Sequence, residues 1–149
     1  MRLSDVDRGG TSGEGTRQAA LDSLKRIIER QIVSPELSTR LICARSGWSR
    51  ATVYRLFQAE GGLARYIRER RLHWALRELM SSSSPYRRIL DLAVDCQFAS
   101  EATFCRAFHR QFGSPPGEVR ALAARVRSGA PDAMPLRAGD GTGSADAIA

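Results

Sequence analysis

Apolar residues recur every three or four positions through most of the chain between residues 17 and 130. This spacing gathers apolar side chains on one face of an α-helix and is typical of helices that pack on a core. No stretch shows the sustained alternation or the density of β-branched residues that strands require. The pattern predicts an all-α fold, with helices at about 17–31, 38–47, 49–60, 63–80, around 89–93, 100–112 and 115–129.

Turn-forming residues separate these predicted helices. Ser34 and Pro35 are predicted to end the first helix, because the helical conformation is disfavoured for a residue that precedes a proline. Gly61 with Gly62 ends the third helix and Gly113 ends the sixth, since glycine adopts the left-handed conformation common at helix C-termini. A run of serines at 81–84 divides the helices into two halves.

One short segment occurs twice, once in each half. Ser49 to Phe57 reads SRATVYRLF and, 51 positions later, Ser100 to Phe108 reads SEATFCRAF. Each serine falls where a helix N-cap belongs, and its side chain there contributes on the order of 1 kcal/mol by accepting a backbone hydrogen bond. The spacing i, i+3, i+4 predicts a buried inner face in both copies: Val53, Leu56 and Phe57 in the first, and Phe104, Ala107 and Phe108 in the second.

Each half combines a short helix, a turn and a capped helix, which is the plan of a helix-turn-helix. In that motif the second helix enters the major groove of DNA, and its N-terminal residues meet the base edges. The outward positions and the two capping serines are therefore the predicted DNA-binding residues: Ser49, Arg50, Ala51, Tyr54 and Arg55 in the first unit, and Ser100, Glu101, Ala102, Cys105 and Arg106 in the second.

The residue types at these positions suit base recognition. Arginine can donate two hydrogen bonds to guanine, and glutamate can accept one from cytosine N4. Ala51 and Ala102 suit contact with a thymine methyl group, or simply allow close approach. Arg55 and Arg106 have a structural alternative, in which each pairs with an acidic side chain of a neighbouring helix or binds phosphate.

Charge supports a polyanionic partner. The chain has a formal net charge of +7, but residues 17–130 hold 20 of the 23 basic residues and only 10 of the 16 acidic ones. A compact helical domain with a net charge of +10 attracts nucleic acid. Because 22 of the 23 basic residues are arginine, a bias in genome composition is an alternative cause, although it does not explain the acidic ends of the chain.

The domain organisation follows from length and composition. With 149 residues the chain holds one domain of ordinary size. Residues 1–16 and 131–149 contain few side chains to bury, so both segments are predicted to be disordered. Residues 17–130 are predicted to be the DNA-binding domain, with a first helix-turn-helix at about 38–60, a linker helix at about 63–80, a second helix-turn-helix at about 86–112 and a last helix at about 115–129.

Cysteine and histidine usage predicts no disulfide framework, metal site or cofactor. Cys43 and Cys96 are expected to be small buried residues in a reducing cytoplasm. Cys105 is expected on the outward face near Arg106, where a redox-sensing thiol is an alternative role. No membrane-spanning run, signal peptide or catalytic set of nucleophile, base and acid is present in the sequence, so a cytoplasmic protein without enzymatic activity is predicted.

The linker helix carries further positive charge that has two interpretations. A single chain with two units could bind adjacent major grooves, which lie about 34 Å apart on one face of B-DNA. The linker arginines are then candidates for phosphate contacts, although most of them are expected only to keep the helix soluble: residues 65, 68, 70, 71 and 77.

The chain from about residue 24 to 120 resembles the DNA-binding domain of AraC/XylS-type bacterial transcription regulators. The resemblance is carried by SRATVYRLF, by YIRERRLHWALREL and by ILDLAVDCQFASEATFCRAFHRQFGSPPGEVR. It implies an all-α, homeodomain-like fold of about seven helices, with double-stranded promoter or operator DNA as a partner and RNA polymerase as a further one. It also implies that the first unit gives most of the base readout and the second contributes contacts to the DNA backbone.

Two departures from the family pattern affect the second unit. Gln97 precedes Phe98 where the family commonly has a glycine, which normally supplies a positive φ, so this turn is expected to be strained or differently shaped. Glu101 adds negative charge where DNA would approach. Base reading is therefore expected chiefly from the first unit.

Two alternatives remain open from the sequence. The chain is either a stand-alone regulator or the C-terminal part of a larger one, since most family members carry a sensory or dimerisation domain. The competing function is a basic helical module that binds an acidic protein without reading DNA.

Overall fold

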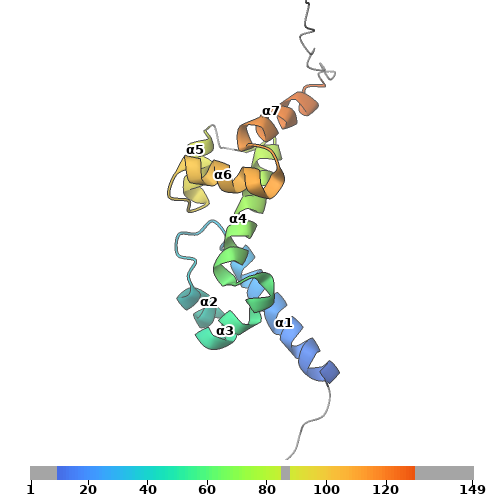
Figure 1. Cartoon of the computed structure of the whole chain (residues 1–149), viewed down its shortest axis with the longest axis vertical. Helices are drawn as coiled ribbons and strands as arrows, with labels where there is room; N and C mark the ends of the chain where they lie inside the picture. The colour runs from blue at the N-terminus through green and yellow to red at the C-terminus, as the bar shows by residue number, and fades with distance from the viewer. Residues whose placement is uncertain (1–9, 85–87, 130–149) are drawn as a thin grey trace, which may run out of the picture.

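Seven α-helices and one short 3-10 helix form the part of the chain that the computed structural model describes, residues 10–84 and 88–129 (Figure 1). These residues contain no strand, which confirms the predicted all-α class. No helix among them is long and apolar enough to cross a membrane. The elements in chain order are α1 (Gly10–Glu29), α2 (Thr39–Ser46), α3 (Arg50–Leu56), η1 (Gln58–Glu60), α4 (Leu63–Met80), α5 (Ile89–Asp95), α6 (Glu101–Phe112) and α7 (Pro116–Arg127).

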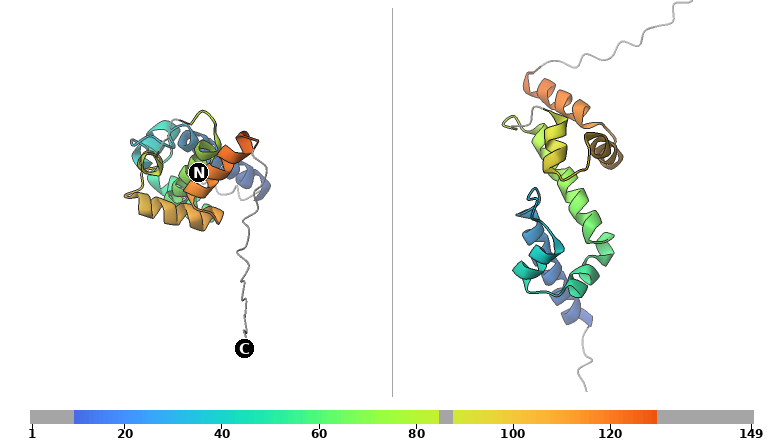
Figure 2. Two further views of the ribbon diagram at one scale, coloured as in Figure 1. Left: turned by 90° about the horizontal axis from the view of Figure 1, so that it is seen from above. Right: turned by 90° about the vertical axis from the view of Figure 1, so that its left-hand side faces the viewer.

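The helices form two units that are joined by α4. Helices α1, α2 and α3 pack together at one end of the long axis, while α5, α6 and α7 gather around the other end of α4 (Figures 1 and 2). Figure 2 shows α4 as a continuous helix running from the first unit into the second. Its 18 residues correspond to about 27 Å at 1.5 Å per residue.

The first unit has its own apolar core. Leu24 and Ile28 of α1 meet Ile42 of α2 and Val53 of α3, and Phe57 closes the cluster. Each of these side chains is fully buried. Burial of a side chain of this size contributes about 1.5 to 3 kcal/mol, so the inner face of α3 is firmly fixed.

The second unit packs around a separate core. Leu72 and Leu79 of α4 face Leu92 of α5, and Phe104 and Phe108 of α6 complete the cluster. The two phenylalanine rings lie 5.7 Å apart between centroids, within the range of favourable aromatic contacts. Because α4 contributes to both cores, it fixes the two units relative to one another.

Two arginines of α4 tie this helix to the end of α1. Arg70 forms an ion pair with Glu29, and the Arg71 guanidinium donates a hydrogen bond of 3.0 Å to the carbonyl oxygen of Ile32. All these contacts are partly buried, where an ion pair is screened less by salt than on an open surface. They hold the first unit against the linker helix.

Most predicted turns and caps are confirmed within the described residues, but the third helix was predicted too long, since α3 ends at Leu56 and the short helix η1 lies between it and Gly61. The Ser38 side chain accepts a hydrogen bond from the Leu41 amide and begins α2. Gly47, Gly61 and Gly113 all have φ near +75° and end α2, η1 and α6. Glycine suits these positions because it adopts positive φ without a side-chain penalty.

The start of α1 corrects the predicted domain boundary. The helix begins at Gly10 instead of about residue 17, so residues 10–16, which we expected to be disordered, are helical. Side chains from 13 to 19 are exposed, so this extension buries nothing that an apolar pattern could reveal. The rest of that segment, residues 1–9, and the predicted tail at 131–149 lie outside the described residues.

The last helix makes its core contacts through its first half, and at its end Arg127 donates a hydrogen bond of 2.9 Å to the Met80 carbonyl oxygen. Pro116 is buried and Val119 contacts the second core, so α7 lies against the C-terminal part of α4. Leu122 and Val126 continue the same apolar pattern, but they are 56% and 72% exposed. Helical spacing therefore predicted the helix correctly, although not which of its apolar side chains are buried.

Candidate nucleic-acid interface

The two reading helices, α3 and α6, begin with the same cap. The Ser49 hydroxyl accepts a hydrogen bond of 3.2 Å from the Thr52 amide, and the Ser100 hydroxyl accepts one of the same length from Thr103. In each unit the serine hydroxyl also shares a hydrogen bond with the threonine hydroxyl, of 3.0 Å between Ser49 and Thr52 and of 2.9 Å between Ser100 and Thr103. The sequence repeat is therefore a repeat of structure, and both capping serines lie where we predicted.

The inner faces of both helices are buried as the repeat predicts. In α3 and directly after it, Val53, Leu56 and Phe57 lie in the first core, and in α6 Phe104 and Phe108 lie in the second. A helix with one face in the core must present the opposite face to solvent or to a partner. The candidate reading residues lie on that opposite face, with the exception of the half-buried Cys105.

The outward face of α3 presents a connected polar group. Arg50, Ala51, Tyr54 and Arg55 are all exposed, as predicted. The Tyr54 hydroxyl shares a hydrogen bond of 3.2 Å with Thr39 at the start of α2. Hydrogen bonding from Thr39, and next from Arg50, lowers the pKa of Tyr54 below its usual value. Tyr54 is therefore held in place between α2 and the first turn of α3.

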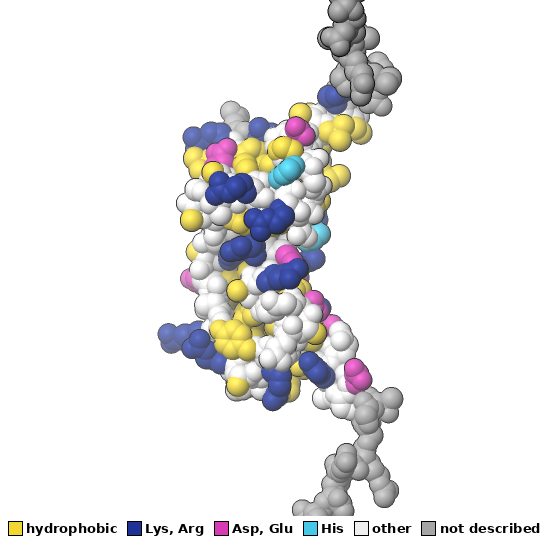
Figure 3. All heavy atoms as spheres, viewed as in Figure 1, with side chains coloured by type: hydrophobic (Ala, Val, Ile, Leu, Met, Phe, Trp, Pro, Cys, Tyr) yellow, Lys and Arg dark blue, Asp and Glu magenta, His cyan; other side chains and the backbone are white. Residues whose placement is uncertain are grey.

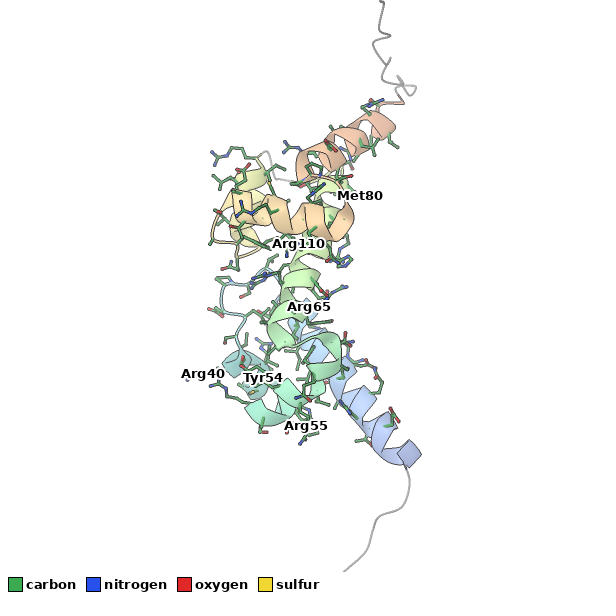
Figure 4. All side chains as sticks on the ribbon, viewed as in Figure 1. Arg40, Tyr54, Arg55, Arg65, Met80 and Arg110 are labelled. Carbon is green, nitrogen blue, oxygen red and sulfur yellow. The ribbon has the colours of Figure 1, made fainter. Side chains whose placement is uncertain are left out.

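Thr39 and Arg40 belong to this surface, although the sequence analysis did not include them. Arg40 is exposed, and Figure 4 shows it at the same edge of the molecule as Tyr54. In a helix-turn-helix the first helix crosses the DNA backbone, so a basic side chain at its start suits a phosphate. The position of Arg40 in the first turn of α2, two residues after the cap Ser38, was the signal that could have identified it.

The two helix-turn-helix segments differ modestly in charge. Residues 38–60 contain four arginines and one acidic residue, a net charge of +3. Residues 86–112 contain four arginines and three acidic residues, so their net charge is +1 with neutral histidine. Figure 3 shows Lys and Arg side chains spread from the level of α6 down to α3 on one face. Positive side chains are thus present on both units, with the larger net charge on the first helix-turn-helix.

The outward face of α6 is mixed. Glu101, Ala102 and Arg106 are exposed, and the Arg106 guanidinium donates a hydrogen bond of 3.3 Å to the Thr103 hydroxyl. Neither Arg106 nor Arg55 forms an ion pair within the described residues, so these residues give no support to the alternative of structural pairing with an acid.

The cysteines correct one expectation and support another. Cys105 is half-buried instead of outward, and its burial, followed by the charge of Glu101, raises the pKa of its thiol. A raised pKa leaves less thiolate at neutral pH, which argues against a redox-sensing role. Cys96 is buried as expected, and this burial raises its pKa to about 12, while Cys43 is only partly buried.

The turns of both units contain a residue with positive φ, but the type of that residue differs. Gly47 has φ of +74° at the end of α2, and Gln97 has φ of +60° after α5. The amide that follows Gln97, that of Phe98, donates 3.0 Å to the Ala93 carbonyl. Gln97 is the only residue other than glycine with positive φ among those described. The expected strain in the second turn is therefore confirmed.

Comparison with known proteins gives consistent matches. A family described as a helix-turn-helix domain matches residues 42–122. The regulatory protein SoxS of Escherichia coli K12 is 34% identical over 107 residues, which cover 70% of this chain and 96% of SoxS.

Two crystal structures show the same architecture. One is a transcriptional regulator with an AraC-type DNA-binding domain from Chromobacterium violaceum, with TM-score 0.63 and 31% identity over 74% of this chain and 97% of that one. The other is the DNA-binding domain of the global transcriptional factor AdpA in complex with a target DNA, with TM-score 0.56 and 25% identity over the same shares. The chain belongs to the AraC-type family of helix-turn-helix transcription regulators.

Proposed function

We propose that the first unit of this regulator reads the base sequence of its DNA target through the outward face of α3. The observation that carries the proposal is the exposed outward face of α3, which holds Arg50, Ala51, Tyr54 and Arg55 and no acidic side chain. Tyr54 on this face is hydrogen-bonded to Thr39 and to Arg50. A net charge of +3 on residues 38–60 attracts the duplex before any base is read.

Each residue has a distinct role in the proposed contact. Arg50, in the first turn of α3, donates two hydrogen bonds to a guanine in the major groove. Ala51 lets the helix approach the base edges closely. Tyr54 makes a directed contact, because its hydroxyl is already oriented by Thr39. A side chain fixed before binding loses less conformational entropy when the complex forms.

The second unit has a positioning role in this proposal. Arg106 and the capping Ser100 face the DNA backbone. Ala102 and the half-buried Cys105 lie between these two residues along α6. Glu101 opposes a close approach to phosphates and restricts any base contact to an exposed cytosine amino group. We therefore assign the larger share of sequence specificity to the first unit.

The relatives support this role at the level of the whole domain. AdpA was crystallised with a target DNA, and SoxS is a regulatory protein. A regulator of this class needs access to the chromosome, so the bacterial cytoplasm is the proposed location. Promoter-bound regulators act by contacting RNA polymerase or by blocking its access, so RNA polymerase is the second proposed partner.

The test begins with selection of bound sequences from a random duplex pool. Arg50→Ala and Tyr54→Ala are then compared with wild type on the selected and on random duplexes. We expect each variant to lose about tenfold to a hundredfold on selected DNA and much less on random DNA. Tyr54→Phe separates the hydroxyl group from the ring.

Arg26→Ala is the matched control, because Arg26 is an exposed arginine on α1 and its removal deletes the same charge outside the outward face of α3. Unchanged binding of the Arg50 and Tyr54 variants to both duplexes would exclude base reading by α3. Equal loss on both duplexes would support the alternative of a basic interaction module.

A further inference from the structure

The five arginines of α4 differ in what they contact. Arg70 and Arg71 are tied to the end of α1, and Arg65 forms an ion pair of 2.7 Å with Glu69 one turn away. Arg68 and Arg77 are exposed and form no hydrogen bond or ion pair within the described residues. The fold therefore uses three of these arginines and leaves two available for a partner.

Arg68 lies where two clefts meet. One cleft of about 340 Å³ lies between α4 and α6 and is lined by Arg65, Arg68 and Arg110, with Glu69 as its one acidic residue. The other, of about 330 Å³, lies between α4 and the second turn and includes Arg68 beside Thr103. Arg68 is thus the side chain that reaches both clefts.

The first of these clefts has the charge of an anion site. Three guanidinium groups face one carboxylate, and the Glu69 carboxylate is already paired with Arg65. Figure 4 shows Arg65 and Arg110 close to one another in the middle of the molecule, on α4 and α6. Like charges gathered this way repel, and an anion between them relieves the repulsion. The planar fork of arginine is well matched to phosphate.

The position of the cleft along α4 indicates which phosphate it would meet. Arg68 lies between Leu63, which packs in the first core, and Leu72, which packs in the second. Two reading helices in adjacent major grooves on one face of B-DNA are separated by about 34 Å, and the backbone strands of the minor groove lie between them. When both candidate helices occupy their grooves, the middle of α4 therefore lies at the level of the part of the duplex that neither of them covers.

We propose that Arg68, with Arg110 across the cleft, binds a DNA backbone phosphate between the two major-groove segments. This inference rests on the proposed function, since it requires a duplex to lie across both units. The contact carries no base information, and it fixes the spacing of the two units on the DNA. It also gives α4 a direct role in binding beyond joining the cores.

The structure offers a matched control on the same helix. Arg77 is exposed, lacks a partner within the described residues, and follows Arg68 by nine residues, which places it on the opposite side of α4. We expect Arg68→Ala to weaken binding to selected and random duplexes by the same factor, about fivefold to tenfold. The slope of log affinity against log salt should fall by about 1, while Arg77→Ala changes neither quantity.

Neutral methylphosphonate linkages locate the contact on the selected duplex. When they replace the phosphates between the two major-groove segments, wild-type affinity should fall to that of Arg68→Ala, and the variant should lose little more. An unchanged salt slope for Arg68→Ala would overturn the inference. If Arg50→Ala still loses its preference for selected DNA in the same assay, the proposed function stands while the inference about Arg68 fails.

Inorganic phosphate separates a backbone contact from a site for a free anion. Millimolar phosphate that raises the melting temperature of wild type and not of Arg68→Ala, with DNA affinity equal in both proteins, would assign the cleft to a free anion and overturn the inference. Circular dichroism melts of both variants check that each is folded. We expect them to match wild type, since neither side chain has a partner within the described residues.

Discussion

Ser49 and Ser100 cap their helices at the same distance, and Val53 and Phe104 occupy the same buried place behind them, but the surfaces in front of these residues differ. The first unit presents only positive charge there, whereas the second balances arginines against acidic residues. The positive φ in its turn belongs to a glutamine, whereas the positive φ in the turn of the first unit belongs to a glycine.

This difference indicates which features the fold requires and which it leaves free. Caps and inner positions determine whether a capped helix packs on its neighbour, so they are alike in both units. Outer positions contribute little to stability, so they can diverge when the units take different roles. This contrast agrees with the proposed roles, in which the first unit reads bases and the second positions the protein on DNA.

The largest expected effects test whether the two cores are independent. Phe57→Ala in the first core and Phe108→Ala in the second each remove a fully buried ring, which destabilises by about 3 to 5 kcal/mol. Because the cores share α4 but few side chains, we expect Phe108→Ala to speed amide hydrogen exchange in α5 and α6 on the order of a hundredfold or more. Exchange in α2 and α3 should change only severalfold.

Phe57→Ala should give the reverse pattern, with rapid exchange in α2 and α3. Trp74 packs against both cores. It is therefore the main side chain through which lost packing in one core could destabilise the other. Equal acceleration throughout α2, α3, α5 and α6 in either variant would show that the two units unfold as one, and the comparison between them would then apply only to their surfaces.

Local signals explain why much of this structure was predictable. Ser38, Ser49 and Gly113 were assigned as helix boundaries from the sequence, and each has the predicted capping geometry. Such signals act over three or four residues. The apolar pattern similarly predicted the inner faces of α3 and α6, because it reflects burial directly.

Long-range contacts account for most of what the sequence did not reveal. The ion pair of Arg70 with Glu29 joins residues 41 positions apart, so nothing nearby distinguished Arg70 from Arg68. The same holds for Tyr54, whose partner Thr39 lies on the preceding helix. Exposed extensions such as the start of α1 leave no apolar pattern at all.

The turns offer a sharper comparison of the two units at a smaller expected effect. Gly47→Ala should destabilise by about 1 kcal/mol, and Gln97→Gly should stabilise by a similar amount, because only glycine adopts positive φ without strain. A Cβ at Gly47 would meet no atom within 4 Å, so the first variant tests the backbone conformation alone. Urea denaturation measures both changes.

Gly117→Ala is the control for these turn variants. Gly117 lies in the first turn of α7 without a positive φ, and a Cβ there also meets open space. Alanine should therefore stabilise at this position, by roughly 0.5 to 1 kcal/mol. If Gln97→Gly instead destabilises the protein, the contacts of the glutamine side chain must contribute more to the free energy of unfolding than the strained backbone costs.

The smallest expected effect concerns the charge on the reading face of the second unit. Glu101→Gln removes a carboxylate from the exposed first turn of α6, so DNA affinity at low salt should rise about threefold and the gain should vanish near 1 M salt, where charges are screened within about 3 Å. Glu118→Gln is the matched control, since Glu118 is exposed in the first turn of α7. A lower affinity for selected DNA alone would instead show that Glu101 reads a cytosine, and the second unit would then share in base recognition.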